Sequence, residues 1–378
     1  MIEIGRISGF RLLAALLLIT ISGQDRPAPR EVAPGVEHSV IRRGDQTGAA
    51  GRDRWQINLL VVDPAKATIR LAQGMDEVAG AETTSSMAAR HGAVAAINGG
   101  YFRTTGIARG EPVGVLSIRG RILSEPVRNR AALVFRDEGN GIRAAFSRIS
   151  LEAELAVGRR SAIRIDGFNR PREKDELIVF TPEFHRTTLT GPDGLELEVV
   201  GGRVVALHEG RGSLPVPRDG LIISASGSAA DKLKTVVRKG SRIEVRTRQR
   251  TDPDAGFEPD FILGGGPRLI AAGRSVIAED ASSYAEAFYT TRHPRTAIGR
   301  RADGRLVLVT VDGRQPALSV GMSIAELASL MLELGCTEAM NLDGGGSTTM
   351  VAGGRIVNSP SDATGERPVS DALLVVRR

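Results

Sequence analysis

The stretch "MNLDGGGSTTM", residues 340–350, places one acidic side chain among groups that suit an anion. Asp343 follows a short apolar run and precedes three glycines and three hydroxyl residues. Glycine lets backbone N–H groups approach a ligand closely, and a carboxylate can serve as nucleophile, base or ligand-orienting group. Asp-Gly is also a common turn sequence, so a simple turn stays open as the alternative for Asp343.

The same order of apolar run and glycine loop occurs twice more. "AVAAIN", residues 93–98, is followed by glycines at 99 and 100, and "DFIL" is followed by glycines at 264–266. Each apolar run has the length and composition of a short strand. The three loops either converge on one pocket or form separate tight turns at a sheet edge, and the residues alone leave both interpretations open.

Several familiar chemistries lack their sequence pattern. The glycine loops are not followed by Lys-Ser/Thr as in a P-loop, and no GxGxxG opens a helix after a strand. No Gly-x-Ser-x-Gly sequence surrounds Ser347, and the five histidines do not have zinc-site spacing. Nucleotide, nucleic-acid, serine-hydrolase and zinc chemistry are therefore not expected.

Further candidates are acids and arginines beside expected turns. Asp312 precedes Gly313, and Glu111 lies in "RGEPVGV". Arginine binds phosphate or carboxylate through paired hydrogen bonds. Three arginines lie at strand ends or turns: Arg295, Arg314 and Arg367. Taken singly, each acid is more often a turn former and each arginine a surface charge, and His293 is more often structural or orienting.

Composition predicts a β-rich chain that is attracted to anions. The 378 residues are 41% hydrophobic, only 4% aromatic, and include 45 glycines, which favours short strands and tight turns over a helical bundle. The net charge is +6, and the basic residues are spread along the chain. Anionic small ligands or cell-surface polymers fit this charge better than nucleic acid does.

The elements that would position these residues can be read along the chain. "WQINLLVVD" and "TIRLAQG" are predicted to be paired strands, and the middle region alternates strands with turns. "TTSSMAARHG" predicts a short helix with a hydroxyl N-cap and Gly92 as its end. "SIAELASLMLELG" predicts the clearest helix, with Ser323 and Glu326 as a capping box. "DALLVVRR" is the predicted closing strand.

The N-terminal segment suggests export. Arg6 and Arg11 flank or precede the apolar run 12–21, which suits a signal peptide or an N-terminal anchor over residues 1–23. Residues 24–36, rich in proline, are expected to be a linker. Cys336 is the only cysteine, so no internal disulfide is possible, and it is expected to be a buried small hydrophobe. We expect a periplasmic or extracellular protein of a bacterium.

Seven stretches then match a known family in order. They are "AINGGYF", "GGGPRLI", "RHPRTAIG", "LVTVDGR", "SVGMSIAELASLMLELG", "NLDGGGSTTM" and "PSDATGERPVSDALLV". Together they resemble the phosphodiester glycosidase family over roughly residues 92–378. The resemblance implies an α+β fold, with one β-rich catalytic domain over residues 37–378, mixed or antiparallel sheets and a few short helices. It also implies hydrolysis of a sugar-1-phosphate diester with release of the free sugar.

The resemblance also implies roles for individual residues. The catalytic candidates are Asp343, Arg295 and Asp312, with Asp343 as nucleophile or base. The substrate-binding candidates are Asn98, Gly99, Gly100, Tyr101, Gly265, Gly266, Arg314, Asn341, Gly344, Gly345, Gly346, Ser347 and Arg367. Arg295, with Arg314 or Arg367, would hold the phosphate. Asn98, Tyr101 and Asn341 would bind sugar hydroxyls.

The expected partner is a sugar-1-phosphodiester or an anionic polysaccharide such as an exopolysaccharide or a teichoic-acid-like polymer. No cofactor and no metal ligand set is expected, although a divalent cation such as Ca²⁺ stays open. Membrane contact is expected only through the N-terminal segment, if that segment is not cleaved. Two other functions stay open: a non-catalytic protein that binds anionic glycans, and a phosphodiesterase that cuts the P–O bond.

Overall fold

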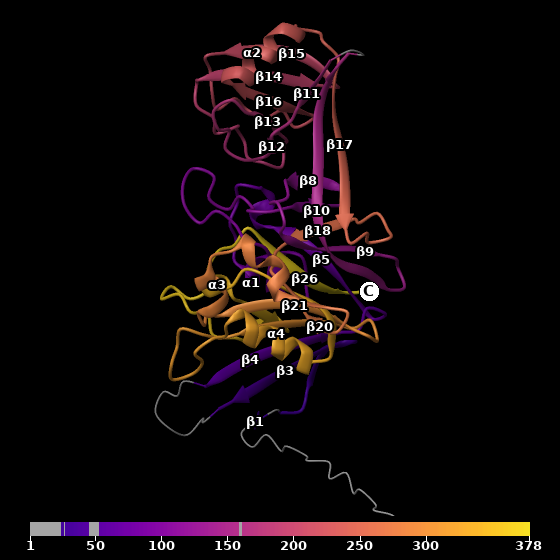
Figure 1. The fold of residues 1–378 in the computed structure, drawn as a ribbon, viewed down its shortest axis with the longest axis vertical. Coiled ribbons are helices and arrows are strands. Elements are labelled where there is room, and N and C mark those ends of the chain that lie inside the picture. The colour runs from indigo at the N-terminus through magenta and orange to yellow at the C-terminus, as the bar shows by residue number, and fades with distance from the viewer. Residues whose placement is uncertain (1–23, 26, 45–52, 159–160) are drawn as a thin grey trace, which may run out of the picture.

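The fold is that of a computed structural model, which describes residues 24–25, 27–44, 53–158 and 161–378. The described residues form four β-sheets with few helices, which confirms the predicted β-rich α+β class (Figure 1). All strand pairs are antiparallel except β12 with β13. The expected signal peptide, residues 1–23, lies outside the described residues.

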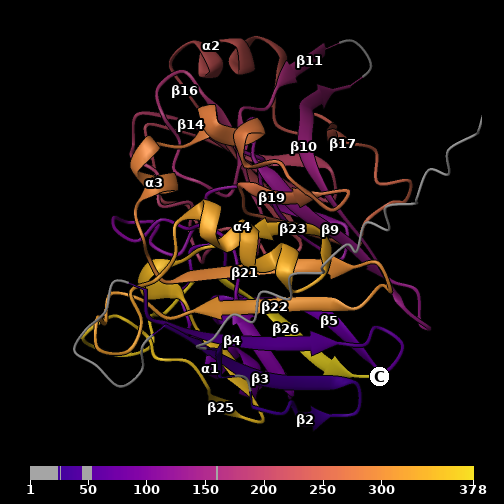
Figure 2. The same cartoon turned by 60° about the horizontal axis from the view of Figure 1, so that its bottom comes forward.

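The largest sheet has nine strands and forms the lower body of the molecule (Figure 2). Its strands are β1 (Gln24–Asp25), β2 (Arg30–Ala33), β3 (Val36–Arg43), β4 (Trp55–Val62), β19 (Arg268–Ala271), β20 (Arg274–Ser275), β21 (Arg295–Arg301), β22 (Leu306–Val311) and β23 (Cys336–Asn341). The segment expected to be a linker thus contributes β1 and β2, which both pair with β3.

The predicted C-terminal helix packs on this sheet. Helix α4 (Ile324–Glu333) begins with the predicted capping box between Ser323 and Glu326. Its buried face includes Leu327 and Met331, which pack against apolar side chains of β19, β21, β22 and β23. Cys336 lies in the same cluster, as predicted, and burial raises the pKa of its thiol to about 12.

A five-stranded sheet carries two of the strand ends that approach the site. Its strands are β5 (Ala67–Gln73), β6 (Ala95–Asn98), β24 (Met350–Ala352), β25 (Arg355–Ile356) and β26 (Asp371–Arg377), in the order β25-β24-β6-β26-β5. The predicted helix before β6 is α1 (Thr84–Arg90), capped by the Thr83 hydroxyl, and Gly92 has a φ of 61° just beyond it.

The predicted pairing of "WQINLLVVD" with "TIRLAQG" is wrong. Both are strands, but β4 pairs with β3 and β22, whereas β5 pairs with β26 in another sheet. Both strands are buried on their two faces, so each needs apolar partners that a two-stranded hairpin cannot supply. The short turn at residues 63–66 carries the chain from one sheet to the other.

The remaining two sheets form the upper part of the molecule (Figure 1). The first contains β7 (Leu116–Ile118), β8 (Arg121–Ser124), β9 (Ala131–Asp137), β10 (Ile142–Val157), β11 (Ser161–Arg164), β17 (Ile243–Asp252) and β18 (Phe261–Gly264). The second, which we call the upper lobe together with α2 (Gly227–Val236), contains β12 (Gly167–Phe168), β13 (Leu177–Phe180), β14 (Gly194–Val200), β15 (Arg203–Glu209) and β16 (Gly220–Ser226). The long ribbon of β10 and β17 rises from the body to this lobe.

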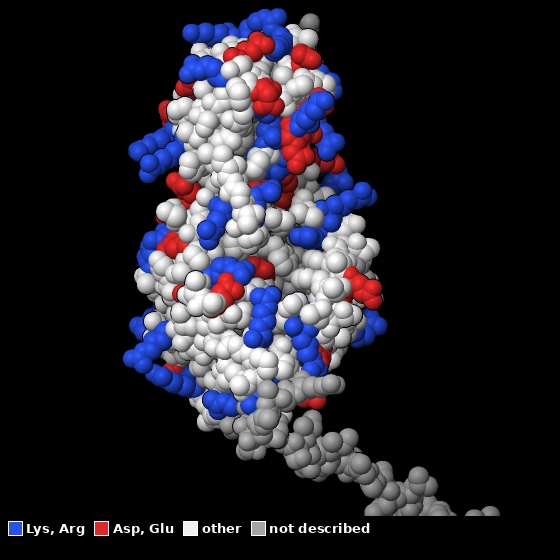
Figure 3. Space-filling model, turned by 90° about the vertical axis from the view of Figure 1, so that its left-hand side faces the viewer, with Lys and Arg blue, Asp and Glu red and all other residues white. Residues whose placement is uncertain are grey.

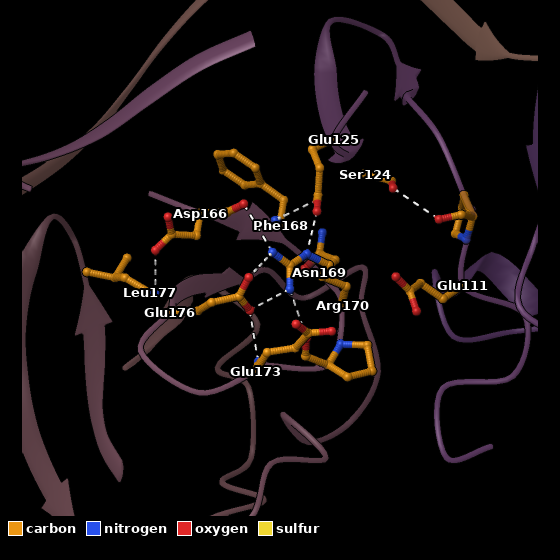
Figure 4. A network of polar contacts seen from close by, with 12 residues as sticks. Glu111, Ser124, Glu125, Asp166, Phe168, Asn169, Arg170, Glu173, Glu176 and Leu177 are labelled. Carbon is orange, nitrogen blue, oxygen red and sulfur yellow. Dashed lines mark hydrogen bonds and ion pairs between the residues drawn. The ribbon is translucent and has the colours of Figure 1, made fainter. Parts of the chain in front are cut away.

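A largely buried arginine links the upper lobe to the seven-stranded sheet. Arg170, in the lobe, donates to Glu176 at 2.7 and 2.8 Å and also pairs with Glu125, which follows β8 (Figure 4). The other carboxylate oxygen of Glu125 accepts from the Phe168 N–H at 2.9 Å. Two carboxylates therefore satisfy one guanidinium group that is only 18% exposed.

Arg170→Met is expected to destabilise the fold by about 3 kcal/mol, because it leaves Glu125 and Glu176 partly buried without their cation. Urea unfolding measures this change. Arg164→Met is the matched control, since that side chain is 85% exposed and loses less than about 0.5 kcal/mol. Equal stability of the two variants would contradict the assignment of Arg170 as the fastening residue.

Candidate active site

The three glycine loops pack against one another and are not separate turns at a sheet edge. The Asp343 N–H donates to the Gly99 carbonyl at 3.1 Å, and the Gly266 N–H donates to the Asn341 carbonyl at 2.7 Å. A Cβ at Gly100 would lie 2.7 Å from the Gly264 carbonyl oxygen. No other residue fits there, because an L side chain would overlap the neighbouring backbone.

Asn98 links the loop at Asp343 to neighbouring strands through side-chain hydrogen bonds. Its side chain is fully buried, its Nδ2 donates to the Asp343 carbonyl at 2.7 Å, and its Oδ1 accepts from Thr296 Oγ1 at 2.8 Å and from the Thr349 N–H at 3.1 Å. These bonds occupy both acceptor positions of the amide oxygen and one of the two donor hydrogens of the nitrogen. The geometry therefore favours a positioning role for Asn98 over the expected contact with a sugar hydroxyl.

Asn341 and Tyr101 form a second brace. Asn341 Nδ2 donates to the Tyr101 hydroxyl at 2.8 Å and to the Gly266 carbonyl at 3.1 Å, and the Tyr101 hydroxyl donates to the same carbonyl at 2.6 Å. Burial raises the pKa of Tyr101 well above its ordinary value, so this hydroxyl keeps its proton. Asn341 Oδ1 is buried and has no hydrogen-bond partner in the described part of the chain.

Asp343 is a largely enclosed carboxylate with no ion pair to another described residue. Burial raises its pKa to about 6, and the neighbouring Asp371 adds to this effect. The Ser347 hydroxyl, the Gly344 N–H at 2.9 Å and the charge of Arg367 oppose the shift. A carboxyl group that titrates near neutrality is typical of catalytic positions.

Two arginines press against the glycine loop that follows Asp343. Arg314 has a left-handed backbone with a φ of 60°, and its exposed side chain makes no ion pair within the described ranges. A Cβ at Gly345 would lie 3.0 Å from Arg314 Nη2. Arg367 abuts Gly346 in the same way and donates to both oxygens of Asp362 at 2.7 and 2.9 Å. An unpaired arginine in a strained conformation is a candidate ligand for an anion.

Arg295 is buried in the same region of the protein as Arg314. It is 2% exposed, and it donates to the backbone carbonyls of Met322 at 2.8 Å, Phe288 at 2.9 Å and Thr291 at 3.0 Å. Burial lowers its pKa to about 10. These contacts favour Arg295 as an anchor for helix α3 (Glu286–Thr290) over the expected direct phosphate ligand.

Asp312 also has a supporting position. It is fully buried, and its oxygens accept from Gln56 and Asn358 at 3.1 Å and from the Ser359 N–H at 2.9 Å. Burial raises its pKa to about 6. Because Asn358 also donates to the Thr348 carbonyl at 3.0 Å, Asp312 braces the segment after the glycine loop. Direct catalysis by Asp312 is not supported by this arrangement.

Glu111 lies apart from the loops. Its side chain is 4% exposed and pairs with Arg103 at 2.8 Å, and burial raises its pKa. Figure 4 shows it beside the Arg170 network, at the base of the upper lobe. Its weak signal as an acid candidate therefore corresponds to a buried ion pair.

Two residues near the site were not selected from the sequence. His293 has a buried Nδ1 without a partner among the described residues, and burial, Arg295 and Arg314 lower its pKa, so its ring is neutral at pH 7. Asp371 is 1% exposed, and its Oδ1 accepts from the Gly100 N–H at 2.8 Å. Their positions, two residues before Arg295 and at the start of the closing strand, were the only sequence signals.

Aromatic side chains lie beside the glycine loop at residues 264–266. All three tyrosines of the chain, Tyr101, Tyr284 and Tyr289, gather beside the loop at 264–266. The Tyr284 hydroxyl donates to the Gly265 carbonyl at 3.1 Å, and Arg130 lies 5.1 Å from the centre of the Tyr284 ring. Figure 3 views the side on which α3 lies and shows basic and acidic side chains interspersed from the lobe to the body.

Within the described ranges, no three His, Cys, Asp or Glu residues are grouped so that they could hold a metal ion. No helix in the same ranges has the length and apolar character needed to cross a membrane.

Fold and geometry together define a β-rich protein whose site is centred on a carboxylate and flanked by basic side chains. Residues 193–376 match the model of the phosphodiester glycosidase family. The predicted resemblance to that family is confirmed for this part of the chain.

Three known proteins are similar to this chain. A structure of a Burkholderia pseudomallei protein described as exported has a TM-score of 0.81 and 25% identity, with 94% of this chain and 97% of that chain covered. The SPbeta prophage-derived protein YomE of Bacillus subtilis is 46% identical over 84 residues, 22% of this chain. Mouse N-acetylglucosamine-1-phosphodiester alpha-N-acetylglucosaminidase is 29% identical over 159 residues, 39% of this chain. The matched parts span 13% and 30% of the lengths of the last two proteins.

Asp343→Asn is expected to stabilise the folded protein at pH 7.5 by about 1–3 kcal/mol. The folded-state pKa of about 6 exceeds the ordinary value of 3.8, so the ionised carboxylate costs stability once the pH has risen through this interval. The difference in free energy of unfolding between variant and wild type should therefore shrink as the pH falls from 6 to 4. Thermal unfolding across pH measures it.

Asp303→Asn is the control, because that side chain is exposed and its replacement should change the free energy of unfolding by less than about 0.5 kcal/mol. A destabilised Asp343→Asn protein at pH 7.5 would contradict the assignment of Asp343 as an uncompensated buried carboxylate.

Proposed function

We propose that this protein is a hydrolase that releases a free sugar from a sugar-1-phosphate diester. One observation carries the proposal: an uncompensated carboxylate, Asp343, lies next to a glycine loop against which Arg314 and Arg367 press. This pairs a group that can attack or stabilise a sugar carbon with groups that hold a phosphate. The match of residues 193–376 to the family model supports the same reaction class.

The leaving group decides which catalytic groups are required. A phosphomonoester departs readily as an anion, so the sugar–oxygen bond needs little help from a general acid. The demanding steps are to hold the phosphate charge and to stabilise positive charge at the sugar carbon. Asp343 meets the second demand, either as nucleophile or as base for water. The arginines at the glycine loop meet the first.

The arginine without a partner among the described residues is the best candidate to bind the phosphate. Arg314 has no partner in the described ranges, whereas Arg367 shares its charge with Asp362 and Arg295 is occupied by carbonyl groups. We therefore assign Arg314 as the principal phosphate ligand, with Arg367 beside it. The neutral ring of His293 can donate a hydrogen bond to the same anion without adding charge.

The proposal also covers the class of substrate and the place where the protein acts. The chain carries 50 Lys and Arg residues against 44 Asp and Glu residues, which favours a phosphodiester-linked polysaccharide, exopolysaccharide or teichoic-acid-like polymer over a neutral glycan. An exported protein, periplasmic or extracellular, would meet such a polymer. The apolar run at residues 12–21 supports export through a signal peptide.

Asp343→Asn is expected to lower kcat on a sugar-1-phosphodiester at least about 10³-fold, since the amide can neither attack nor accept a proton. Release of free sugar measures the effect, and the thermal unfolding profile confirms that the variant is folded. A folded variant with full turnover would end the proposal, and binding of anionic glycan without any turnover by the wild type would favour the non-catalytic function.

The pH profile separates the roles of Asp343. As nucleophile or base it must be ionised, so kcat/KM should rise with pH through a midpoint near 6. Activity that instead falls as the pH rises through 6 would identify Asp343 as a general acid and contradict this assignment.

Arg314→Ala is expected to raise KM or lower kcat/KM by about 10- to 100-fold, the scale of a lost charged hydrogen bond. Arg314→Lys keeps the charge but loses the paired donors, so it should recover only part of this effect. Wild-type kinetics in the alanine variant would show that Arg314 does not contact the phosphate.

A further inference from the structure

A concave surface lies away from the glycine loops, along β5 at the edge of the five-stranded sheet. This groove has a volume of about 510 Å³, a size typical of ligand sites. Its walls come from β5 and β26 on one side and from the turn between β7 and β8 on the other, with Arg70, Gln73, Arg119 and Phe261 among the lining residues.

The unpaired charge in this groove is positive. Its three acids are each neutralised by an arginine: Asp76 by Arg90 at 2.6 Å, Asp137 by Arg378 at 2.8 Å, and Glu183 by Arg121. Arg70 and Arg119 also line the groove, are exposed, and have no ion-pair or hydrogen-bond partner in the described part of the chain. Two cations are thus left to face a ligand, which makes the groove complementary to an anion.

The backbone at Arg119 supports a functional role. Arg119 and Gly120 form the two-residue turn between β7 and β8, with φ values of 53° and 74°. Asn, Asp or Gly is favoured at the first position of such a turn, so an arginine there costs backbone strain. Arg119 and Arg314 are the two arginines with positive φ within the described ranges, and neither has an ion-pair partner there. Arg119 lines the groove, whereas Arg314 lies beside Gly345.

Gln73 also lines the groove, but its amide nitrogen lies beneath the surface. The residue is 8% exposed, and its buried Nε2 has no hydrogen-bond partner among the described residues. A buried amide donor without a partner loses free energy unless a ligand or water satisfies it. Gln73 therefore helps to shape the wall of the groove, and the two arginines supply the contacts with a ligand.

The groove ends close to the candidate active site. Gln73 is the cross-strand partner of Asp371 on the adjacent strand β26. Directly opposed residues on antiparallel strands have Cβ atoms about 5 Å apart. Asp371 in turn accepts the Gly100 N–H, next to Asp343. Only one pair of strands thus separates the end of the groove from the glycine loops.

The opposite end continues toward the upper lobe. A second hollow of about 510 Å³ shares Arg121 and Glu183 with the groove and passes beneath β14, β16 and β17. Its lining adds Arg218 and the apolar side chains of Leu221 and Ile243. The two hollows together offer an elongated surface, which fits a chain of several sugars better than a single small ligand.

We propose that this groove binds an anionic stretch of a polysaccharide substrate at a distance from the bond that is cut. Arg70 and Arg119 hold phosphate or carboxylate groups of the chain. This inference rests on the proposed hydrolysis of a sugar-1-phosphodiester and specifies its substrate as a charged polymer. Small diesters reach the glycine loops without using the groove.

The test compares polymer and small substrates in the variant Arg70→Ala/Arg119→Gly. Glycine relieves the positive φ at residue 119, so the substitution removes a charge without adding strain. With phosphomannan as polymer, KM should rise about 10-fold or more and kcat should stay unchanged, because two charge-assisted contacts are lost. With a sugar-1-phosphate methyl ester, both constants should match the wild type. Arg274→Ala, an exposed arginine outside the groove, is the control.

An unchanged KM for phosphomannan would overturn the proposal, and so would an equal loss on both substrates. A binding measurement keeps this test separate from the proposed reaction. Calorimetric titration of phosphomannan into Asp343→Asn, with and without the groove substitutions, should show weaker binding in the combined variant, and uncharged mannan should bind neither protein measurably. If no diester is hydrolysed, the proposed function fails, while equal binding by the two proteins refutes the groove alone.

Discussion

The close packing of three strand-end loops is the constraint on which the site depends. Gly100 lies against the backbone of Gly264, and Asp343 donates its N–H to Gly99, so three distant parts of the chain meet within hydrogen-bond distance. Only residues without a side chain permit this approach. Asn98 then fixes the arrangement, since its amide bonds to Asp343, Thr296 and Thr349 at once.

The electrostatic character of the site follows from this packing. Backbone and neutral side chains enclose Asp343, so burial raises its pKa and no cation pairs with it. The nearby cations either remain free, as Arg314 does, or serve carbonyl groups, as Arg295 does. Asp343 is destabilised by burial, and Arg314 beside the same glycine loop has a strained backbone. Such a combination is expected where function opposes stability.

Sequence reasoning predicted many of the elements, and it drew attention to Asp343, whose catalytic role stays a prediction. Capping residues located α1 and α4, and the glycine loops after apolar strands located Asp343, because these signals are local. The errors are non-local. Three residues, Asn98, Arg295 and Asp312, could face a ligand or brace the backbone, and burial decides this for all of them. For Asn98 the deciding partners are also 198 to 251 residues away in the sequence. The pairing of β5 with β26 and the position of Asp371 follow from tertiary contacts that no short motif encodes.

The central claim is that the carboxylate at the glycine loops acts on a sugar carbon while the phosphate stays intact. Hydrolysis of a sugar-1-phosphodiester in ¹⁸O-labelled water, followed by mass spectrometry of both products, tests it most directly. The claim predicts that the label enters the free sugar and that the phosphomonoester remains unlabelled. Label in the phosphomonoester would show that the P–O bond is cut and would contradict the account.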